Sequence, residues 1–141
     1  MKKLLGPYSD FFFFLLRAAA ALMFLAHGLQ KFNIAMLGGF EPPFTALVVA
    51  RWLETIGGVL ILVGLVTRWA GFILSGEMAF AYFMSHAPRN FFPILNAGDG
   101  AILYCFIFLY IAAAGGGPWS IDAIMSRDRY PEPAPEGLQR R

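Results

Sequence analysis

Four long apolar stretches alternate with short polar or Gly/Pro-rich connections along this chain. A helix needs roughly 20 mainly apolar residues to cross a bilayer, and each stretch is about that long. The pattern predicts helices over residues 11–30, 46–66, 69–87 and 98–114. Asp10 is the expected N-cap of the first helix. The predicted fold class is therefore all-α, a four-helix transmembrane bundle.

Three connections separate the predicted helices. A Gly/Pro-rich segment at residues 38–43 breaks the chain before the second helix, and Thr67 and Arg68 make a very short turn into the third. The aromatic segment 88–93 is expected at the membrane interface.

After the fourth helix, residues 119–125 are expected to form a short interfacial helix, with Ser120 as its cap and Trp119 at headgroup level. Residues 126–141 are polar, contain three prolines, and are interpreted as a tail without a core of its own. We therefore expect one membrane domain over residues 1–125.

Basic residues are divided unevenly between the two sides that four spans would create. One side carries Lys2, Lys3, Arg68, Arg127, Arg129, Arg140 and Arg141, and the other carries Lys31 and Arg89. Because Lys and Arg are enriched in cytoplasmic connections, both termini are expected in the cytoplasm of a bacterial-type inner membrane. The first apolar run exceeds the hydrophobic region of a signal peptide, so we interpret it as an uncleaved helix.

Composition supports this class. Of the 141 residues, 58% are hydrophobic and 14% are charged, whereas about 25% are charged in ordinary soluble domains. The basic residues are dispersed, so nucleic acid is not an expected partner. Cys105 is the single cysteine, which excludes an internal disulfide and a thiolate metal cluster, and we expect it to be a small buried hydrophobe. No metal site is predicted.

Charged residues inside the apolar stretches are the best clue to function. An ionisable group at membrane depth costs about 2.5–3.5 kcal/mol, so it usually faces a partner or a cavity. Counting residues along each helix brings most of these groups to the outer half of the membrane. The candidate binding residues are His27, Lys31, Arg51, Glu54, Glu77 and Asp99. Arg17 is the exception, near the cytoplasmic side, where it can snorkel to the interface.

Three interpretations of these residues remain open. In the first they are structural pairs without a ligand, joining Arg51 to Glu54, Lys31 to Asp99 and Arg17 to Glu77. In the second they surround a small polar-headed lipophile, and in the third they transfer protons or a solute. We expect Arg51 and Glu54 to point inward, and Arg17, Arg51 or His27 to contact Glu77 directly or through water. If Glu77 is buried and unpaired instead, it is expected to be protonated and a candidate for a proton relay.

A quinone is the ligand that this set of residues favours. His27, Lys31 and Arg51 offer donors to its carbonyl groups, and Glu54 or Glu77 can take part in proton transfer. An apolar slot for its tail is expected from Phe24, Phe80 and Phe106. The stripe on the fourth helix that faces the pocket is expected to contain Asp99, Leu103, Phe106 and Tyr110.

A haem held by His27 and His86 is disfavoured, because His86 directly precedes Ala87-Pro88 at a helix end and is poorly held. The chain has no visible electron carrier, so an oxidoreductase activity requires a partner protein. The sequence assigns no catalytic residue and does not decide whether the chain is an enzyme.

Taken in order, the motifs of this chain resemble those of the DoxX family of small membrane proteins. They are Arg17 with His27-Gly28-x-x-Lys31, Glu54-x-x-Gly57-Gly58, Leu62-x-Gly64-Leu65-x-Thr67-Arg68, Glu77-Met78, Asn96-Ala97-Gly98-Asp99 and Gly115-x-Gly117-Pro118-Trp119-Ser120-x-Asp122. Relatives often carry Gly-Glu where this chain has Gly98-Asp99. The resemblance implies a four-helix membrane bundle and redox chemistry, since members are linked to thiosulfate:quinone oxidoreduction and to complexes with sulfurtransferases or superoxide dismutase.

Three functions follow from these observations. The leading hypothesis is a small integral membrane subunit of a quinone-linked redox complex, in contact with lipid and a partner protein. The second is a non-catalytic subunit that anchors or assembles a larger membrane complex. The third is a transporter of protons or a small solute, although the chain lacks a visible inverted repeat and Gly/Pro-broken spans.

Overall fold

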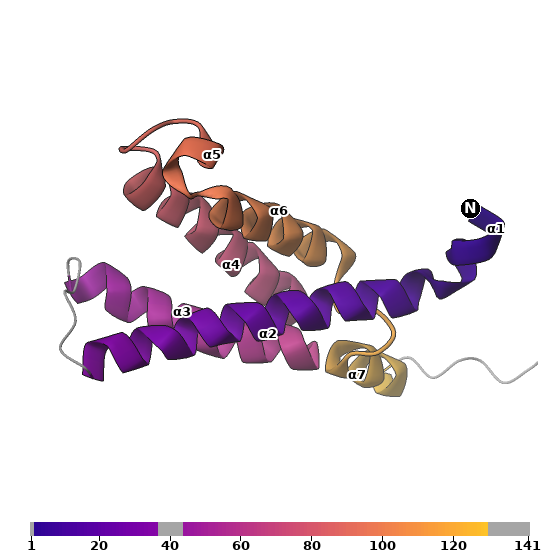
Figure 1. Cartoon of the computed structure of the whole chain (residues 1–141). Coiled ribbons are helices and arrows are strands. Elements are labelled where there is room, and N and C mark those ends of the chain that lie inside the picture. Colours follow the sequence, from indigo (N-terminus) through magenta and orange to yellow (C-terminus); the bar gives the residue numbers. More distant parts are fainter. Residues whose placement is uncertain (1, 37–43, 130–141) are drawn as a thin grey trace, which may run out of the picture.

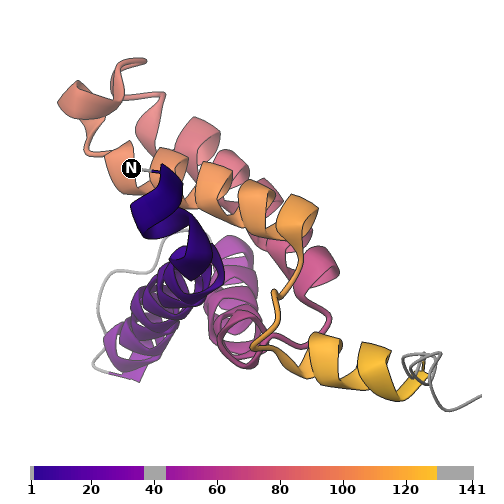
Figure 2. The same cartoon turned by 90° about the vertical axis from the view of Figure 1, so that its right-hand side faces the viewer.

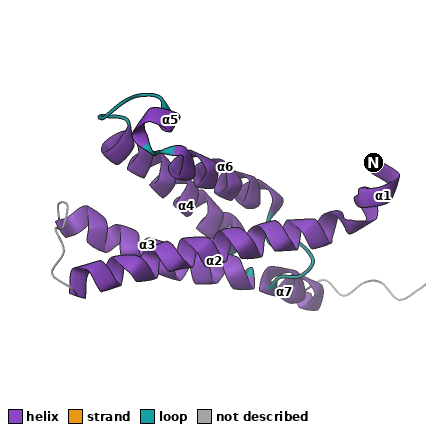
Figure 3. Cartoon of the chain, viewed as in Figure 1, coloured by secondary structure: helices purple, strands orange, loops and turns teal. Residues whose placement is uncertain are grey.

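The computed structural model of the chain describes residues 2–36 and 44–129. Every regular element in these ranges is helical (Figure 3), which confirms the all-α fold class. In chain order the elements are α1 (Lys2–Leu5), the 3-10 turn η1 (Gly6–Tyr8), α2 (Ser9–Met36), α3 (Phe44–Val63), α4 (Thr67–Ala81), the π-helical turn η2 (Tyr82–His86), α5 (Pro93–Asn96), α6 (Asp99–Ala114) and α7 (Ile121–Arg129).

The longer helices form two pairs in this part of the chain. Helix α2 packs along α3, and α4 packs along α6, while α3 and α4 join the pairs. In Figure 1 the pairs meet near α7 and spread apart toward α5. Figure 2 shows α2 and α3 nearly end-on, with α4 and α6 crossing them as a second layer. The buried core between the layers includes Phe24, Ile61, Leu74, Phe108 and Ile111.

The two ends of the molecule differ in what they contain. The N-terminal segment and α7 lie toward one end, and α5 lies at the other (Figure 1). We call these the α7 end and the α5 end. Residues 38–43 and 130–141, predicted to be a connection and the main part of a tail, lie outside the described residues.

The turn between α3 and α4 differs from the prediction. Helix α3 ends at Val63 rather than at residue 66, because Gly64 and Val66 adopt positive φ angles of 71° and 50°. This conformation ends a right-handed helix and favours glycine. Thr67 and Arg68, predicted as the turn, form the first residues of α4 instead.

At two further helix starts, one predicted N-cap is wrong and one is confirmed. Asp10 is not an N-cap, since α2 begins at Ser9 and Asp10 lies in its first turn. Ser120 does cap α7, because its Oγ accepts a hydrogen bond from the Ala123 amide at 3.2 Å. Helix α7 continues to Arg129, so it is longer than the predicted segment 119–125.

One described stretch, Gly6–Phe32, is helical, long and apolar enough to cross a membrane, with a mean hydropathy of 1.8. Helix α6 is apolar but shorter, at 16 residues. Cys105 of α6 is half-buried, with its Sγ 3.5 Å from Ser75 Oγ of α4.

Candidate functional site

Arg17 connects three elements at the α7 end. Arg17 belongs to α2, and its side chain is fully buried. It donates hydrogen bonds to the carbonyl oxygens of Ile61 and Leu62, the latter at 2.9 Å, and to that of Trp119 at 2.7 Å. The last carbonyls of a helix lack intrahelical partners, and Arg17 supplies donors to two of them in α3. The predictions that Arg17 snorkels, or pairs with Glu77, are therefore wrong.

Asp122 of α7 caps the beginning of α4. Its Oδ1 and Oδ2 accept hydrogen bonds from the amides of Val66 and Thr67, both at 2.8 Å, and its own amide donates to Gly64 O at 2.9 Å. Burial raises the pKa of this carboxyl. The hydrogen bonds from Thr67 and Val66 and the charge of Arg17 outweigh that effect and hold the pKa below its usual range.

Arg68 of α4 caps the C-terminal end of α6. Its guanidinium donates to the carbonyl oxygens of Ala112 at 3.1 Å, Ala113 at 2.5 Å and Ala114 at 3.4 Å, in the last turn of the helix. Gly64 allows these elements to approach, because a Cβ there would lie 2.4 Å from Ser120 Cβ. Three helix termini at the α7 end are thus satisfied by side chains from other elements.

An open pocket of about 480 Å³ lies beside these contacts, between the start of α4, residues 114–117 and α7. Arg68 and Asp122 line it, and both side chains already bond helix termini. We therefore interpret the charged groups of this pocket as structural.

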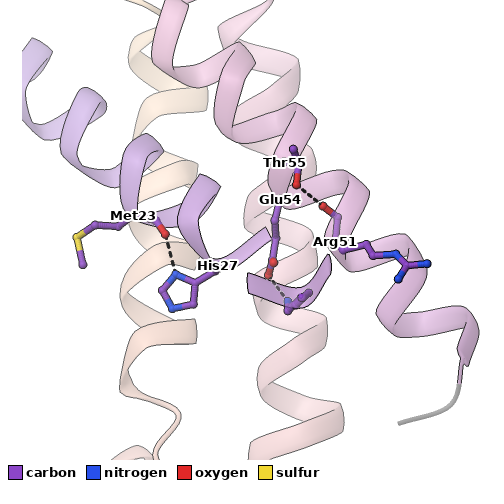
Figure 4. A network of polar contacts seen from close by, with 6 residues as sticks. Met23, His27, Arg51, Glu54 and Thr55 are labelled. Atoms are coloured by element: carbon purple, nitrogen blue, oxygen red, sulfur yellow. Dashed lines mark hydrogen bonds and ion pairs between the residues drawn. The ribbon is translucent and has the colours of Figure 1, made fainter. Parts of the chain in front are cut away.

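A second polar group lies nearer the α5 end, where α2, α3 and α4 meet. Lys31 of α2 forms an ion pair with Glu54 of α3, and the Glu54 side chain is only 3% exposed (Figure 4). Gly28 permits this contact, since a Cβ at that position would lie 2.5 Å from Thr55 Oγ1. The close approach of α2 to α3 brings Lys31, one turn further along α2, to Glu54.

Glu77 of α4 completes this group. Both of its carboxyl oxygens are buried and lack a hydrogen-bond partner among the described residues, and the same holds for Glu54 Oε2. Gly57 of α3 lies against Leu74 of α4, since a Cβ there would be 2.6 Å from Leu74 Cδ2. The two helices are joined by a short turn and run in opposite directions, so Glu54 and Glu77, each one turn further toward the α5 end, lie at the same level. We call Lys31, Glu54 and Glu77 the carboxyl cluster. The predicted direct contact of Glu77 with an arginine or His27 does not occur in the part of the chain that is described.

His27 and Tyr104 lie next to each other between α2 and α6. His27 is exposed, and its Nδ1 donates to the Met23 carbonyl at 2.7 Å (Figure 4). The ring centroids of His27 and Tyr104 are 6.1 Å apart. The Tyr104 hydroxyl is buried without a partner in the described ranges. Sequence reasoning missed Tyr104, because a tyrosine in an apolar run gives no signal of a polar role.

Three predicted site residues lie outside the cluster, namely His27, Arg51 and Asp99. The Arg51 guanidinium stacks on Phe32, 5.2 Å from the ring centroid, and points away from Glu54 in Figure 4. Asp99 is exposed in the first turn of α6. The predicted pairs of Arg51 with Glu54 and of Lys31 with Asp99 are wrong, because Glu54 and Lys31 bind each other.

The predicted apolar slot is also wrong. Phe24 is buried in the core, but Phe80 and Phe106 are 58% and 65% exposed. Leu103 and Tyr110, expected on the same pocket-facing stripe as Asp99, are exposed as well. Helix α6 is apolar on all sides, so its sequence carries no information about which face packs inward.

The α5 end is held by its own hydrogen bonds. The buried Asn96 donates to the Asn90 carbonyl at 2.5 Å, and its Oδ1 accepts from the Gly98 amide at 2.7 Å. The Asn96 carbonyl accepts from His86 Nδ1 at 3.0 Å. His86 is therefore firmly held, contrary to the prediction. No group of His, Cys, Asp and Glu side chains suited to a metal ion occurs in the described ranges.

Comparisons with known proteins identify the family. The DoxX family model matches residues 12–87. A protein of Haemophilus influenzae named "Uncharacterized protein" is 42% identical over 127 residues, covering 84% of this chain and 93% of the relative. The chain therefore belongs to the DoxX family, a membrane-associated family.

The name of a second relative refers to an activity. "Putative oxidoreductase CatD" of Bacillus subtilis is 40% identical over 67 residues, covering 43% of this chain and 49% of the relative. No solved structure matches the chain.

Proposed function

We propose that this chain is a small multi-pass membrane subunit of a redox-associated complex, and that it binds a quinone beside the carboxyl cluster. Membership of the DoxX family and the similarity to a relative named as an oxidoreductase support a redox role. The buried polar groups of α2, α3, α4 and α6 support the place of binding.

Several features support a multi-pass arrangement. Helices α2 and α3 have 28 and 20 residues, and α4 continues through η2 from Thr67 to His86. At 1.5 Å per residue, about 20 residues span the hydrocarbon core. Large apolar side chains such as Leu22, Ile56 and Phe72 are more than half exposed, which suits contact with lipid. The excess of basic residues supports a cytoplasmic location for the α7 end and both termini, in an inner membrane.

The observation that carries the quinone proposal is a set of buried polar atoms without partners among the described residues. Those at the proposed site are both Glu77 oxygens, Glu54 Oε2 and the Tyr104 hydroxyl, while Arg17 Nε, Arg51 Nε and Thr67 Oγ1 lack partners elsewhere in the described ranges. Each such group costs free energy unless a ligand or water satisfies it. A quinone needs donors to two carbonyl oxygens beside an apolar surface. The Tyr104 hydroxyl and the Lys31 ammonium offer the donors. Phe24 offers apolar surface beside them, since its ring centroid lies 5.4 Å from that of Tyr104.

When bound, a quinone would accept electrons and protons. The residues of this chain would orient its carbonyl groups through Tyr104 and Lys31 and exchange protons at the carboxyl cluster. A partner protein would deliver the electrons.

A non-catalytic anchoring subunit is the second candidate. Trp69, Phe72 and Ile73 form an exposed apolar surface on α4, which suits contact with another membrane helix as well as with lipid.

The test uses the full chain purified in mild detergent and titrated with a short-tailed quinone. A ligand at 100 times its dissociation constant stabilises the folded state by about 2.7 kcal/mol, so the thermal midpoint should rise. Tyr104→Phe removes one donor without changing the packing, and it should reduce the quinone-dependent rise.

Tyr110→Phe is the matched control, because Tyr110 is exposed on the same helix, and it should respond like the wild type. If added quinone left the thermal midpoint of the wild type unchanged, the quinone proposal would be contradicted. A stable stoichiometric partner in that case would support the anchor.

A further inference from the structure

The carboxyl cluster has unbalanced charge. It contains one ammonium group, on Lys31, and two carboxyl groups, on Glu54 and Glu77. If both acids were ionised, the cluster would hold a net charge of −1 where Glu54 is 3% exposed and both Glu77 oxygens are buried. A buried charge is costly unless it is paired.

The neighbouring groups do not supply the missing positive charge. On α2, His27 bonds Met23 O through Nδ1, and Arg17 binds the end of α3. On α3, Arg51 stacks on Phe32. On α6, Tyr104 presents a neutral phenol. Within the described residues, Lys31 is therefore the one cation that faces the two acids.

We propose that the carboxyl cluster binds one exchangeable proton and that Glu77 holds it. Lys31 pairs with Glu54, whereas Glu77 has no hydrogen-bonding partner in the described part of the chain. The proton therefore resides on Glu77. This inference deepens the proposed function, since it names the proton-carrying group of the same site, but the proton site does not require bound quinone.

The chemistry is an acid–base exchange without oxidation or reduction. On uptake, an O–H bond forms on one Glu77 oxygen with a proton from water, and the net charge of the cluster becomes zero. On release, that bond breaks and the proton returns to water or to an acceptor oxygen on a bound ligand.

The proposal predicts how many protons each variant holds, because that number equals the carboxyl groups minus the cations. The wild type should hold one, Glu77→Gln none, Lys31→Gln two, and Lys31→Gln combined with Glu54→Gln one. Infrared spectroscopy of the purified full chain at neutral pH measures this through the C=O stretch of a protonated carboxylic acid. The wild-type band should shift in D₂O, disappear in Glu77→Gln, and have about twice its amplitude in Lys31→Gln.

Asp99→Asn is the control, because Asp99 is an exposed carboxyl outside the cluster, and it should leave the band unchanged. Thermal unfolding of each variant checks that the fold is retained. Should Lys31→Gln unfold, Glu77→Gln still decides the question, since the amide is an isostere of the neutral acid.

Three results would overturn the proposal. They are a wild type without the band, a band that survives Glu77→Gln but is lost in Glu54→Gln, and a band that is absent in NaCl but present in choline chloride. The last would show that a sodium ion takes the place of the proton. A wild-type band that is lost in Glu77→Gln, combined with a thermal midpoint that added quinone leaves unchanged, would support the proton site and contradict the quinone proposal.

Discussion

At the α7 end, Arg17, Arg68 and Asp122 each satisfy the terminus of a helix to which they do not belong. In the carboxyl cluster, Glu77 has both oxygens buried and no hydrogen-bond partner among the described residues. Both places contain charged groups that the sequence predicts inside apolar helices. Burial of charge therefore does not by itself indicate a functional site. Arg17 Nε and Thr67 Oγ1 are also buried without a partner, but Arg17 bonds three carbonyl oxygens through its other nitrogens, whereas neither Glu77 oxygen has a partner in the described ranges. A charged group with none of its hydrogen-bonding atoms satisfied is therefore the better criterion.

The largest effect should come from Arg17→Met. Its removal leaves the carbonyl oxygens of Ile61, Leu62 and Trp119 without this donor. Each buried unsatisfied group costs about 1–3 kcal/mol, so we expect the free energy of unfolding to fall by about 3–5 kcal/mol. Unfolding in detergent measures the loss. A variant as stable as the wild type would show that the α7 end does not depend on Arg17.

Gly64→Ala should have the next largest effect. Gly64 has a φ of 71°, and the new Cβ would lie 2.4 Å from Ser120 Cβ. Strain and the displacement of α7 should together cost about 2–3 kcal/mol. Gly76→Ala is the matched control, because that position on α4 has no neighbour within 4 Å of the new Cβ. Equal midpoints for the two variants would contradict the close packing at the turn.

Asp122→Asn should cost about 1–2 kcal/mol at neutral pH, as expected for a weakened helix cap. The pKa of Asp122 is lowered in the folded state, so the folded state binds its proton less readily than the unfolded state. The stabilisation is thus present above the unfolded pKa of about 4 and is lost as the pH falls through the lowered folded value. Unfolding measured between neutral and acidic pH should show a smaller loss in Asp122→Asn than in the wild type.

The smallest effect on stability should come from Glu77→Gln. The amide is an isostere of the neutral acid, and no cation pairs with Glu77 in the described structure. We expect a change within about 0.5 kcal/mol. If Glu77→Gln lowered the free energy of unfolding as much as Arg17→Met, Glu77 would be ionised and structurally paired. The carboxyl cluster and the α7 end would then not differ in this respect.

The sequence predicts the helices well, because long apolar runs separated by Gly and Pro leave few alternatives. It predicts side-chain partners poorly. The depth of Arg17 along its helix predicts that it snorkels to the interface, or pairs with Glu77 in the structural interpretation. Its partners are instead backbone carbonyls of α3 and of Trp119, and composition does not show where a helix leaves carbonyls unpaired. Arg51 and Glu54 share a helix face at a spacing of three, yet their side chains diverge.

Some of the missing information was present in the motifs. Gly64, Thr67 and Arg68, together with Ser120 and Asp122, form the contacts at the α7 end. From the sequence, Ser120 is predicted as a cap and Thr67 and Arg68 as a turn, whereas Gly64 and Asp122 stand out only as part of the family motifs. Tyr104 had no comparable signal, because its role depends on His27 and Phe24, which belong to another helix.

The contact between Arg17 and Trp119 joins residues 102 positions apart. A ribosome adds residues at about 5–20 per second. Helix α2 is therefore synthesised several seconds before Trp119, which accepts one of the Arg17 hydrogen bonds. Until then, one of the donors of Arg17 and the first amides of α4 lack the partners that Trp119 and Asp122 later provide. The order of biosynthesis thus makes the α7 end the last to form, and a nascent chain that stops short of α7 should be recognisable to quality-control proteases.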